Sequence, residues 1–151
     1  RLNGKPVGEV GLNMHWASVL GAPVILVVGD DKVADEAKAL VPEIETAVVK
    51  QGISQFTAYN LPLEEARRVI QTAAERAVRR ASTIPQLPRL DSYNLEIDFS
   101  LSEIAHLASF IPTVERIGGR TVRITSDDYR QVQRIRIVCT NLALVVVKQH
   151  F

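Results

Sequence analysis

The feature that most constrains the fold is a run of five aliphatic residues, Val24–Val28, bounded by Pro23 and Gly29. The run is short and mostly β-branched, which favours a strand buried on both faces over a helix. Residues 30–41 read as a helix that ends before a proline, and Glu45–Lys50 read as a second strand. The order strand, helix, strand predicts a βαβ unit with parallel strands.

The turn after the first of these strands has two aspartates, Asp30 and Asp31, either of which can cap the following helix. A nucleotide-binding turn is an alternative interpretation of the same residues. The glycine spacings of dinucleotide-binding and phosphate-binding loops are absent here. The sequence therefore favours a helix cap at this position.

The rest of the chain shows a helix–strand pattern with clear start and stop signals. We predict a helix at 8–20 and an amphipathic helix after Pro62. A strand is predicted at 93–99, followed by a helix that starts with a capping box at 100–103 and ends near Pro112. A strand at 120–125 follows a Gly-Gly turn, and a long final helix is capped by Ser126 or Asp127.

Residues 83–92 contain two prolines and no hydrophobic periodicity, which is typical of a linker. The predicted fold class is α/β, with a βαβ-type first lobe at 1–82 that carries a glycine-rich motif at its start. A smaller α+β lobe with a long C-terminal helix follows at 93–151. The sequence after Leu142 is apolar nearly all round, so we expect it to be buried against another subunit, with this lobe providing an oligomerisation surface.

The charge balance excludes some classes of partner. Lys plus Arg number 18 and Asp plus Glu number 17, for a net charge of +1, which gives no electrostatic reason to expect nucleic acid or an anionic membrane. The arginines of the helix after Pro62 are therefore interpreted as a solvated face. The single cysteine, Cys139, rules out an internal disulfide and fits a reducing, cytoplasmic compartment. The apolar run Leu142–Val147 is far shorter than the roughly 20 residues that span a bilayer.

Glycines surround a single carboxylate, Glu9, close to the first residue of the chain. Such glycine density indicates tight turns or the close approach of another group. A glutamate at a helix start can act as a metal ligand or general base, or can simply stabilise the helix dipole. Asn13 lies one turn later on the same face, where it can orient the carboxylate, contact substrate or be an ordinary surface residue. A catalytic motif so near residue 1, with no initiator Met, leads us to expect the later part of a longer protein.

The three histidines do not complete a metal site with Glu9. His15 lies six residues away, which at about 100° per residue places it off the Glu9 face. His106 falls outside an apolar stripe and is expected to be exposed, and His150 is at the tail. Cys139 lies within an aliphatic stripe and is interpreted as a small buried hydrophobe. A zinc site needs three or four protein ligands, so the partners of Glu9 must come from elsewhere.

Three blocks of the first lobe resemble, in order and spacing, the zinc-dependent D-aminopeptidase family associated with dipeptide transport, whose members are self-compartmentalising peptidases. The blocks are Pro6–Asn13, Pro23–Asp31 and Ala47–Lys50. A looser similarity extends through Glu64–Arg67 and Leu95–Ile97. The resemblance covers nearly the whole chain, but only the C-terminal half of a family member.

The resemblance implies a site of two zinc ions built mostly by the absent N-terminal half, which supplies an Asp-x-Glu pair, two histidines and the catalytic residue. Glu9 matches the last metal ligand, and Asn13 is expected in the substrate pocket. The implied activity is hydrolysis of the N-terminal residue of short peptides, with D-residues preferred. The family also implies a homo-oligomeric ring. The alternative is a non-catalytic binding or assembly module that retains the fold.

Overall fold

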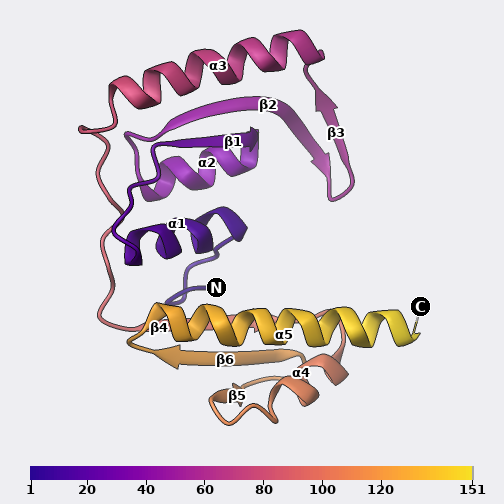
Figure 1. Cartoon of the computed structure of the whole chain (residues 1–151). Helices are drawn as coiled ribbons and strands as arrows, with labels where there is room; N and C mark the ends of the chain where they lie inside the picture. Colours follow the sequence, from indigo (N-terminus) through magenta and orange to yellow (C-terminus); the bar gives the residue numbers. More distant parts are fainter. Residues whose placement is uncertain (151) are drawn as a thin grey trace. The chain divides into compact units, whose positions relative to one another are not determined.

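The computed structural model describes residues 1–150, which divide into two compact units (Figure 1). Residues 7–89 form the first, here called the α/β unit. The second, here called the α+β unit, combines residues 1–6 with the chain from residue 90 onward. No helix among residues 1–150 has the length and apolar character needed to cross a membrane.

The α/β unit contains the predicted βαβ arrangement. Its elements are α1 (Glu9–Val19), β1 (Leu26–Asp30), α2 (Asp31–Leu40), β2 (Glu45–Ser54), β3 (Thr57–Asn60) and α3 (Leu63–Arg79). The sheet has the order β1-β2-β3, with β1 and β2 parallel and β2 and β3 antiparallel. In Figure 1, α2 and α3 lie on opposite faces of the β1–β2 pair, and both helices contact these strands.

The side chain of Asp30 caps α2 by accepting the backbone N–H of Val33 at 2.8 Å, which confirms one of the two predicted caps. Strand β1 begins two residues later than the start of the aliphatic run. The expectation of burial on both faces was wrong for Val28, which is 42% exposed. The reason is its place on an edge strand of the described sheet, where neither a neighbouring strand nor α3 covers it fully.

The sequence did not predict the β2–β3 hairpin. Strand β2 extends four residues beyond Lys50 and turns back through Gln55 and Phe56 into β3. The turn contains no glycine or asparagine, which are the residues that usually mark a two-residue hairpin loop. A register shift between Gly52 and Ser54 further breaks the simple alternation on which strand prediction depends.

Helices α1 and α3 follow their predicted bounds closely. Gly21 follows α1 with a φ of +81°, a left-handed conformation that glycine adopts without strain. Helix α3 is amphipathic as predicted: Ala73 and Ala77 are buried, whereas Leu63 is 65% exposed. Leu63 is the first residue of the helix, so its side chain lies beyond the part of α3 that packs on the sheet.

Part of the stretch expected to be a linker packs on the α/β unit. Ile84 and Leu87 are buried in its core together with Met14, Val27 and Val41. The hydroxyl of Ser18 donates a hydrogen bond to the carbonyl of Leu87. These contacts fix residues 84–87 against α1.

The α+β unit is an antiparallel sheet with two helices. Its elements are β4 (Tyr93–Asp98), α4 (Ser102–Ala108), β5 (Val114–Arg116), β6 (Thr121–Ser126) and α5 (Tyr129–His150), with strand order β4-β6-β5. The central strand confirms the strand predicted at 120–125, and its Val122 and Ile124 side chains are fully buried. Residues 1–6 join this unit because Leu2 bridges to Leu95 beside β4.

Two predicted helix caps in this unit were wrong. Helix α4 begins at Ser102 after Leu101, and no side chain caps it, so the predicted capping box does not form. Asp128 caps α5 by accepting the N–H of Arg130 at 2.9 Å, whereas Ser126 accepts the N–H of Asp128. Three adjacent polar residues can each serve as a cap, and backbone geometry decides between them.

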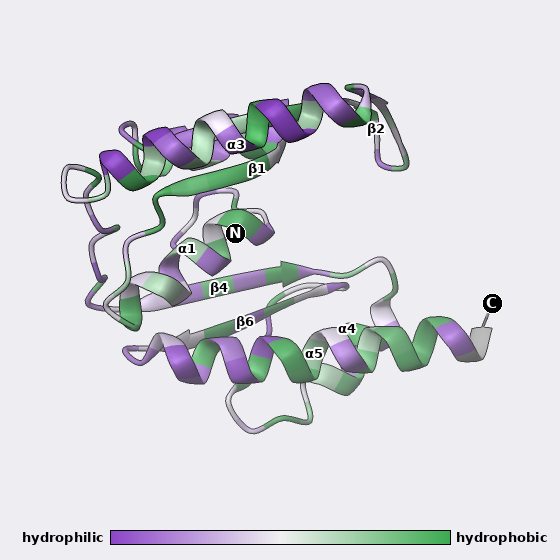
Figure 2. Ribbon diagram, turned by 45° about the horizontal axis from the view of Figure 1, so that its top comes forward, coloured by the Kyte–Doolittle hydropathy of each residue, from purple (hydrophilic) through white to green (hydrophobic). Residues whose placement is uncertain are grey.

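Figure 2 shows apolar and polar residues alternating along α5, with apolar residues more frequent toward its C-terminal end. Cys139 and Val146 are buried, which fits the predicted stripe. Leu144 and Val145 are 61% and 52% exposed in this chain. Their burial against another subunit stays a prediction.

Candidate functional site

Glu9 is the first residue of α1, and its side chain is exposed. The N-cap residue before it, Gly8, has extended backbone geometry and offers no side chain to the free N–H groups of the first helical turn. The positive end of the α1 dipole therefore lies beside the Glu9 carboxylate. An exposed carboxylate at such a helix end is chemically suited to coordinate a divalent metal ion.

The glycines on either side of Glu9 make room for a second carboxylate. Glu36 of α2 accepts the backbone N–H of Gly8, with 2.7 Å between Oε1 and N. A Cβ atom at Gly8 would lie 2.5 Å from Glu36 Oε2, and a Cβ at Gly11 would lie 2.6 Å from both Glu36 Oε1 and Val7 Cγ2. Real Cβ atoms essentially never approach other heavy atoms this closely. The close approach that the glycine density indicated is therefore the contact of α1 with α2.

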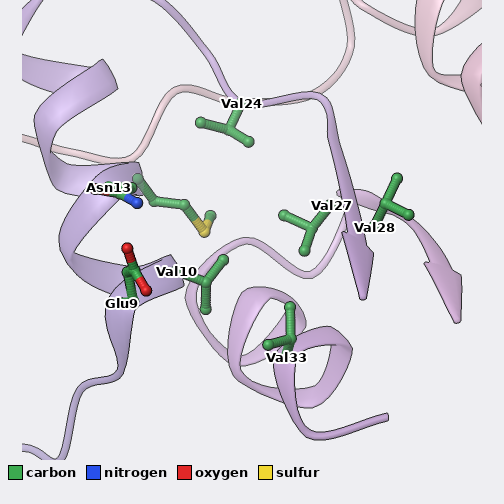
Figure 3. A pocket seen from close by; sticks show the side chains of 8 residues that line it. Glu9, Val10, Asn13, Val24, Val27, Val28 and Val33 are labelled. Carbon is green, nitrogen blue, oxygen red and sulfur yellow. The ribbon is translucent and has the colours of Figure 1, made fainter. Parts of the chain in front are cut away.

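Asn13 and Glu9 lie on the same side of α1, one turn apart (Figure 3). Both line a pocket of about 370 Å³ within the α/β unit. The other residues that line the pocket are apolar. They come from α1, from β1 and the segment just before it, and from α2: Val10, Met14, Val24, Val27, Val28 and Val33. The arrangement places two polar groups beside a surface suited to an aliphatic side chain.

The other candidate residues are not among those that line this pocket. His15 is buried, and burial lowers the pKa of its imidazole below the ordinary value of 6.5. His106, in the α+β unit, is exposed as predicted, with its ring centroid 4.8 Å from that of Phe110. Cys139 is fully buried in α5, and burial raises the pKa of its thiol. The side chain of His150 lies outside the described residues.

The described residues do not contain a group of three or more His, Cys, Asp or Glu side chains that could hold a metal ion. Glu9 has the right chemistry for zinc, but one carboxylate cannot satisfy the three or four protein ligands that zinc requires. The residues that the structure describes therefore fit one position of a zinc site and do not complete it.

The sequence analysis did not predict two contacts of glutamate side chains. One is the hydrogen bond from the Gly8 N–H to Glu36, and the other is the ion pair of Glu45 with arginines of α3. Arg76 Nε of α3 lies 3.1 Å from Glu45 Oε2, and Arg80 contacts the other oxygen of the same carboxylate. The sequence suggested a solvated arginine face, because nothing in the local pattern shows that the start of β2 lies under α3. Glu36 is 28 residues from Gly8, so local pattern could not reveal that contact either.

Comparison with known proteins identifies the family. The peptidase M55 family model, described as D-aminopeptidase, matches residues 1–137. The chain belongs to this D-aminopeptidase family. The resemblance read from the sequence motifs is therefore confirmed.

A curated member of the D-aminopeptidase family from Bacillus subtilis (strain 168) is 33% identical over 144 residues. A solved structure, the Zn-dependent D-aminopeptidase DppA from Bacillus subtilis, described as a self-compartmentalizing protease, matches with a TM-score of 0.87 at 32% identity. Both matches cover 95% of this chain and 53% of the relative. The α/β fold class is confirmed, and the chain spans about half the length of these relatives.

Proposed function

We propose that this chain is the C-terminal part of a zinc-dependent aminopeptidase that removes the N-terminal residue, preferably a D-amino acid, from short peptides. The observation that carries the proposal is the exposed Glu9 carboxylate at the N-terminus of α1, beside a pocket lined mainly by apolar side chains. Membership of the D-aminopeptidase family supports the same activity.

Glu9 is proposed as one metal ligand of a site with two zinc ions. The remaining ligands and the catalytic residue would come from a polypeptide corresponding to the half of the relatives that this chain does not span. Zinc bound in such a site lowers the pKa of a bound water and polarises the scissile carbonyl. Within this chain, Glu36 fixes the start of α1 and so limits the directions in which the Glu9 carboxylate can point.

Asn13 is proposed to bind the substrate. Its side-chain amide can donate to a peptide carbonyl and accept from an amino group, and it is exposed on the same side of α1 as Glu9. The apolar pocket beside it offers a volume of about 370 Å³, enough to receive an aliphatic side chain of the substrate. Pocket shape would then decide between D- and L-residues.

We also propose that the chain assembles as a homo-oligomeric ring. The solved relative is described as a self-compartmentalizing protease, which supports assembly of this chain. The exposed apolar side chains near the end of α5, Leu144 and Val145, are a candidate contact surface. Burial of such residues in an interface would remove an unfavourable apolar surface from water.

The test combines this chain with the complementary half of the protein, which is expected to carry an Asp-x-Glu pair and two histidines. Bound zinc is measured by elemental analysis, and hydrolysis is measured with matched D-Ala and L-Ala peptides. The proposal predicts zinc and preferential D-Ala release by the combined protein. A stable complex with neither zinc nor hydrolysis would contradict it and favour a non-catalytic assembly module.

A further inference from the structure

The part of the β2–β3 hairpin that follows Lys50 is unusual because it carries no charge. Every residue from Gln51 to Leu63 is uncharged, although 23% of the whole chain is Asp, Glu, Lys or Arg. We call residues 51–61 the hairpin arm. In Figure 1 the arm continues past the end of β1, whose pairing with β2 stops at Lys50. Its base is held by Asp31, which accepts the N–H of Gly52 at 2.9 Å.

The hairpin arm exposes large apolar side chains. Phe56, in the two-residue turn, is 91% exposed, Tyr59 of β3 is 72% exposed, and Ile53 of β2 is 53% exposed. Single exposed hydrophobic residues are common on protein surfaces. Two aromatic residues and an isoleucine in one short uncharged segment form a cluster of the kind that marks an interaction surface.

Strand β3 also lies at an edge of the described sheet, beside β2 alone. The N–H of Leu61 donates to the Val49 carbonyl at 2.9 Å, so it points toward β2. Because backbone groups alternate in direction along a strand, those of Ala58 and Asn60 point toward the open side. Natural edge strands are usually protected by proline or by charged residues such as lysine, and β3 (Thr57–Asn60) has none of these.

We propose that the hairpin arm is a contact surface for the hairpin arm of a second copy of this chain. Two identical arms meet without like-charge repulsion because neither is charged. Two identical edge strands can also pair antiparallel about a two-fold axis, which brings the same residues together from both copies. An acidic or basic partner would gain no electrostatic attraction from such an arm. The inference rests on the proposed assembly and names one surface in it: a two-fold contact of this kind joins copies in pairs, so a ring needs a further contact elsewhere on the chain.

The first test compares oligomer mass by light scattering over a concentration series. The chain is compared with Phe56→Ser in the hairpin arm and with Phe110→Ser, a control at a phenylalanine that is 68% exposed in the α+β unit. Phe56→Ser is expected to weaken association by about tenfold or more, as loss of an aromatic anchor does. Phe110→Ser is expected to leave association unchanged. A monomeric parent chain at all concentrations, or equal association of parent and Phe56→Ser, would overturn the proposal.

The second test probes the open edge of β3. Asn60→Lys adds a charge to an exposed residue whose backbone points toward the proposed partner strand, and it should also weaken association. Hydrogen exchange at the amides of Ala58 and Asn60 should slow as the concentration rises, while the amide of Tyr59, which points toward β2, should change little. Unchanged exchange at Ala58 and Asn60 in the assembled chain would overturn the proposal.

These readouts are independent of zinc and peptide hydrolysis. Failure to bind zinc, with assembly through the hairpin arm intact, would contradict the proposed function but leave this inference in place. Assembly that persists in both Phe56→Ser and Asn60→Lys would contradict the inference and leave the proposed ring to other surfaces.

Discussion

The carboxylate of Glu36 accepts the backbone N–H of Gly8 with a separation of 2.7 Å, and this contact joins α2 to the first turn of α1. Gly8 immediately precedes Glu9, so the contact holds the backbone next to the candidate metal ligand. The glycines of the motif serve the same contact, because side chains at Gly8 or Gly11 would occupy the space of the Glu36 carboxylate. The motif therefore has two parts: Glu9 is the candidate metal ligand, and the glycines leave room for the Glu36 carboxylate.

Replacing Glu36 should loosen this helix end. We expect Glu36→Ala to lower the free energy of unfolding by about 1 kcal/mol, the typical net worth of one hydrogen bond. Glu36→Gln keeps an acceptor oxygen and should lose less. Urea denaturation measures the change, with Asp35→Ala as a control at an exposed neighbour on α2. Equal stability of Glu36→Ala and Asp35→Ala would show that the contact contributes nothing.

Replacing Gly11 tests the packing requirement. Gly→Ala inside a helix normally stabilises it by up to about 1 kcal/mol. At Gly11 the added Cβ would collide with Glu36 and Val7, so we expect Gly11→Ala to destabilise the protein by about 1–2 kcal/mol through overpacking. Thermal and urea denaturation would both detect this.

The control for Gly11 is Gly119→Ala, since a Cβ at Gly119 would have no heavy atom within 4 Å and the residue has no positive φ. We expect this variant to be as stable as the parent protein. A Gly11→Ala variant that is more stable than the parent would contradict the role assigned to the glycine.

The Glu45 carboxylate should make stability depend on pH in the acid range. Burial raises its pKa, but the hydrogen bonds from Arg76 and Arg80 outweigh burial and hold the pKa below the ordinary value of 4.5. A lowered folded-state pKa gives stabilisation that is fully present above the unfolded value and is lost as the pH falls through the folded value. The free energy of unfolding should therefore fall below about pH 4.5.

The matched variant for this prediction is Glu45→Gln, which should be less stable at neutral pH and show a flatter acid limb. Arg76→Ala should cost about 1–2 kcal/mol at neutral pH, because it removes one hydrogen bond to a charged group. Urea denaturation at pH 3 to pH 7 measures both effects. The same pH dependence in Glu45→Gln as in the parent protein would contradict the assignment.

Cys139 should be chemically inert in the folded protein. Its thiol is fully buried, and burial raises its pKa, so the reactive thiolate is scarce at neutral pH. We expect alkylation by iodoacetamide to be slow in buffer and fast after unfolding in guanidinium chloride. Rapid alkylation of the native protein would contradict the interpretation of Cys139 as a small buried hydrophobe.

Local sequence pattern predicted the elements whose burial follows from neighbouring residues. The β1–α2–β2 unit, the strand predicted at 93–99 and the buried stripe of α5 all express a hydrophobic period. The hairpin arm was missed because its turn at Gln55 and Phe56 has no glycine signal. The exposure of Val28 was missed because an aliphatic run does not reveal whether its strand has a neighbour on both sides.

The candidate site also contains residues that local sequence pattern could indicate and residues that it could not. Glu9 and Asn13 could be proposed from the sequence because the motif and the helix period are local, and both residues line one pocket; their roles as metal ligand and substrate contact stay predictions. Glu36 and Glu45 could not be identified, because their partners lie 28 to 35 residues away in the sequence. Contacts between distant segments depend on the packing of complete elements, which no local period encodes.

The most direct test of the account is the zinc content and turnover of Glu9→Gln in the protein combined with its complementary half. The control is Glu65→Gln, an exposed glutamate that, like Glu9, lies in the first turn of its helix. The account predicts that Glu9→Gln keeps its fold but loses bound zinc and D-Ala-peptide hydrolysis, whereas Glu65→Gln retains both. Full zinc occupancy and unchanged turnover in Glu9→Gln would contradict the central claim.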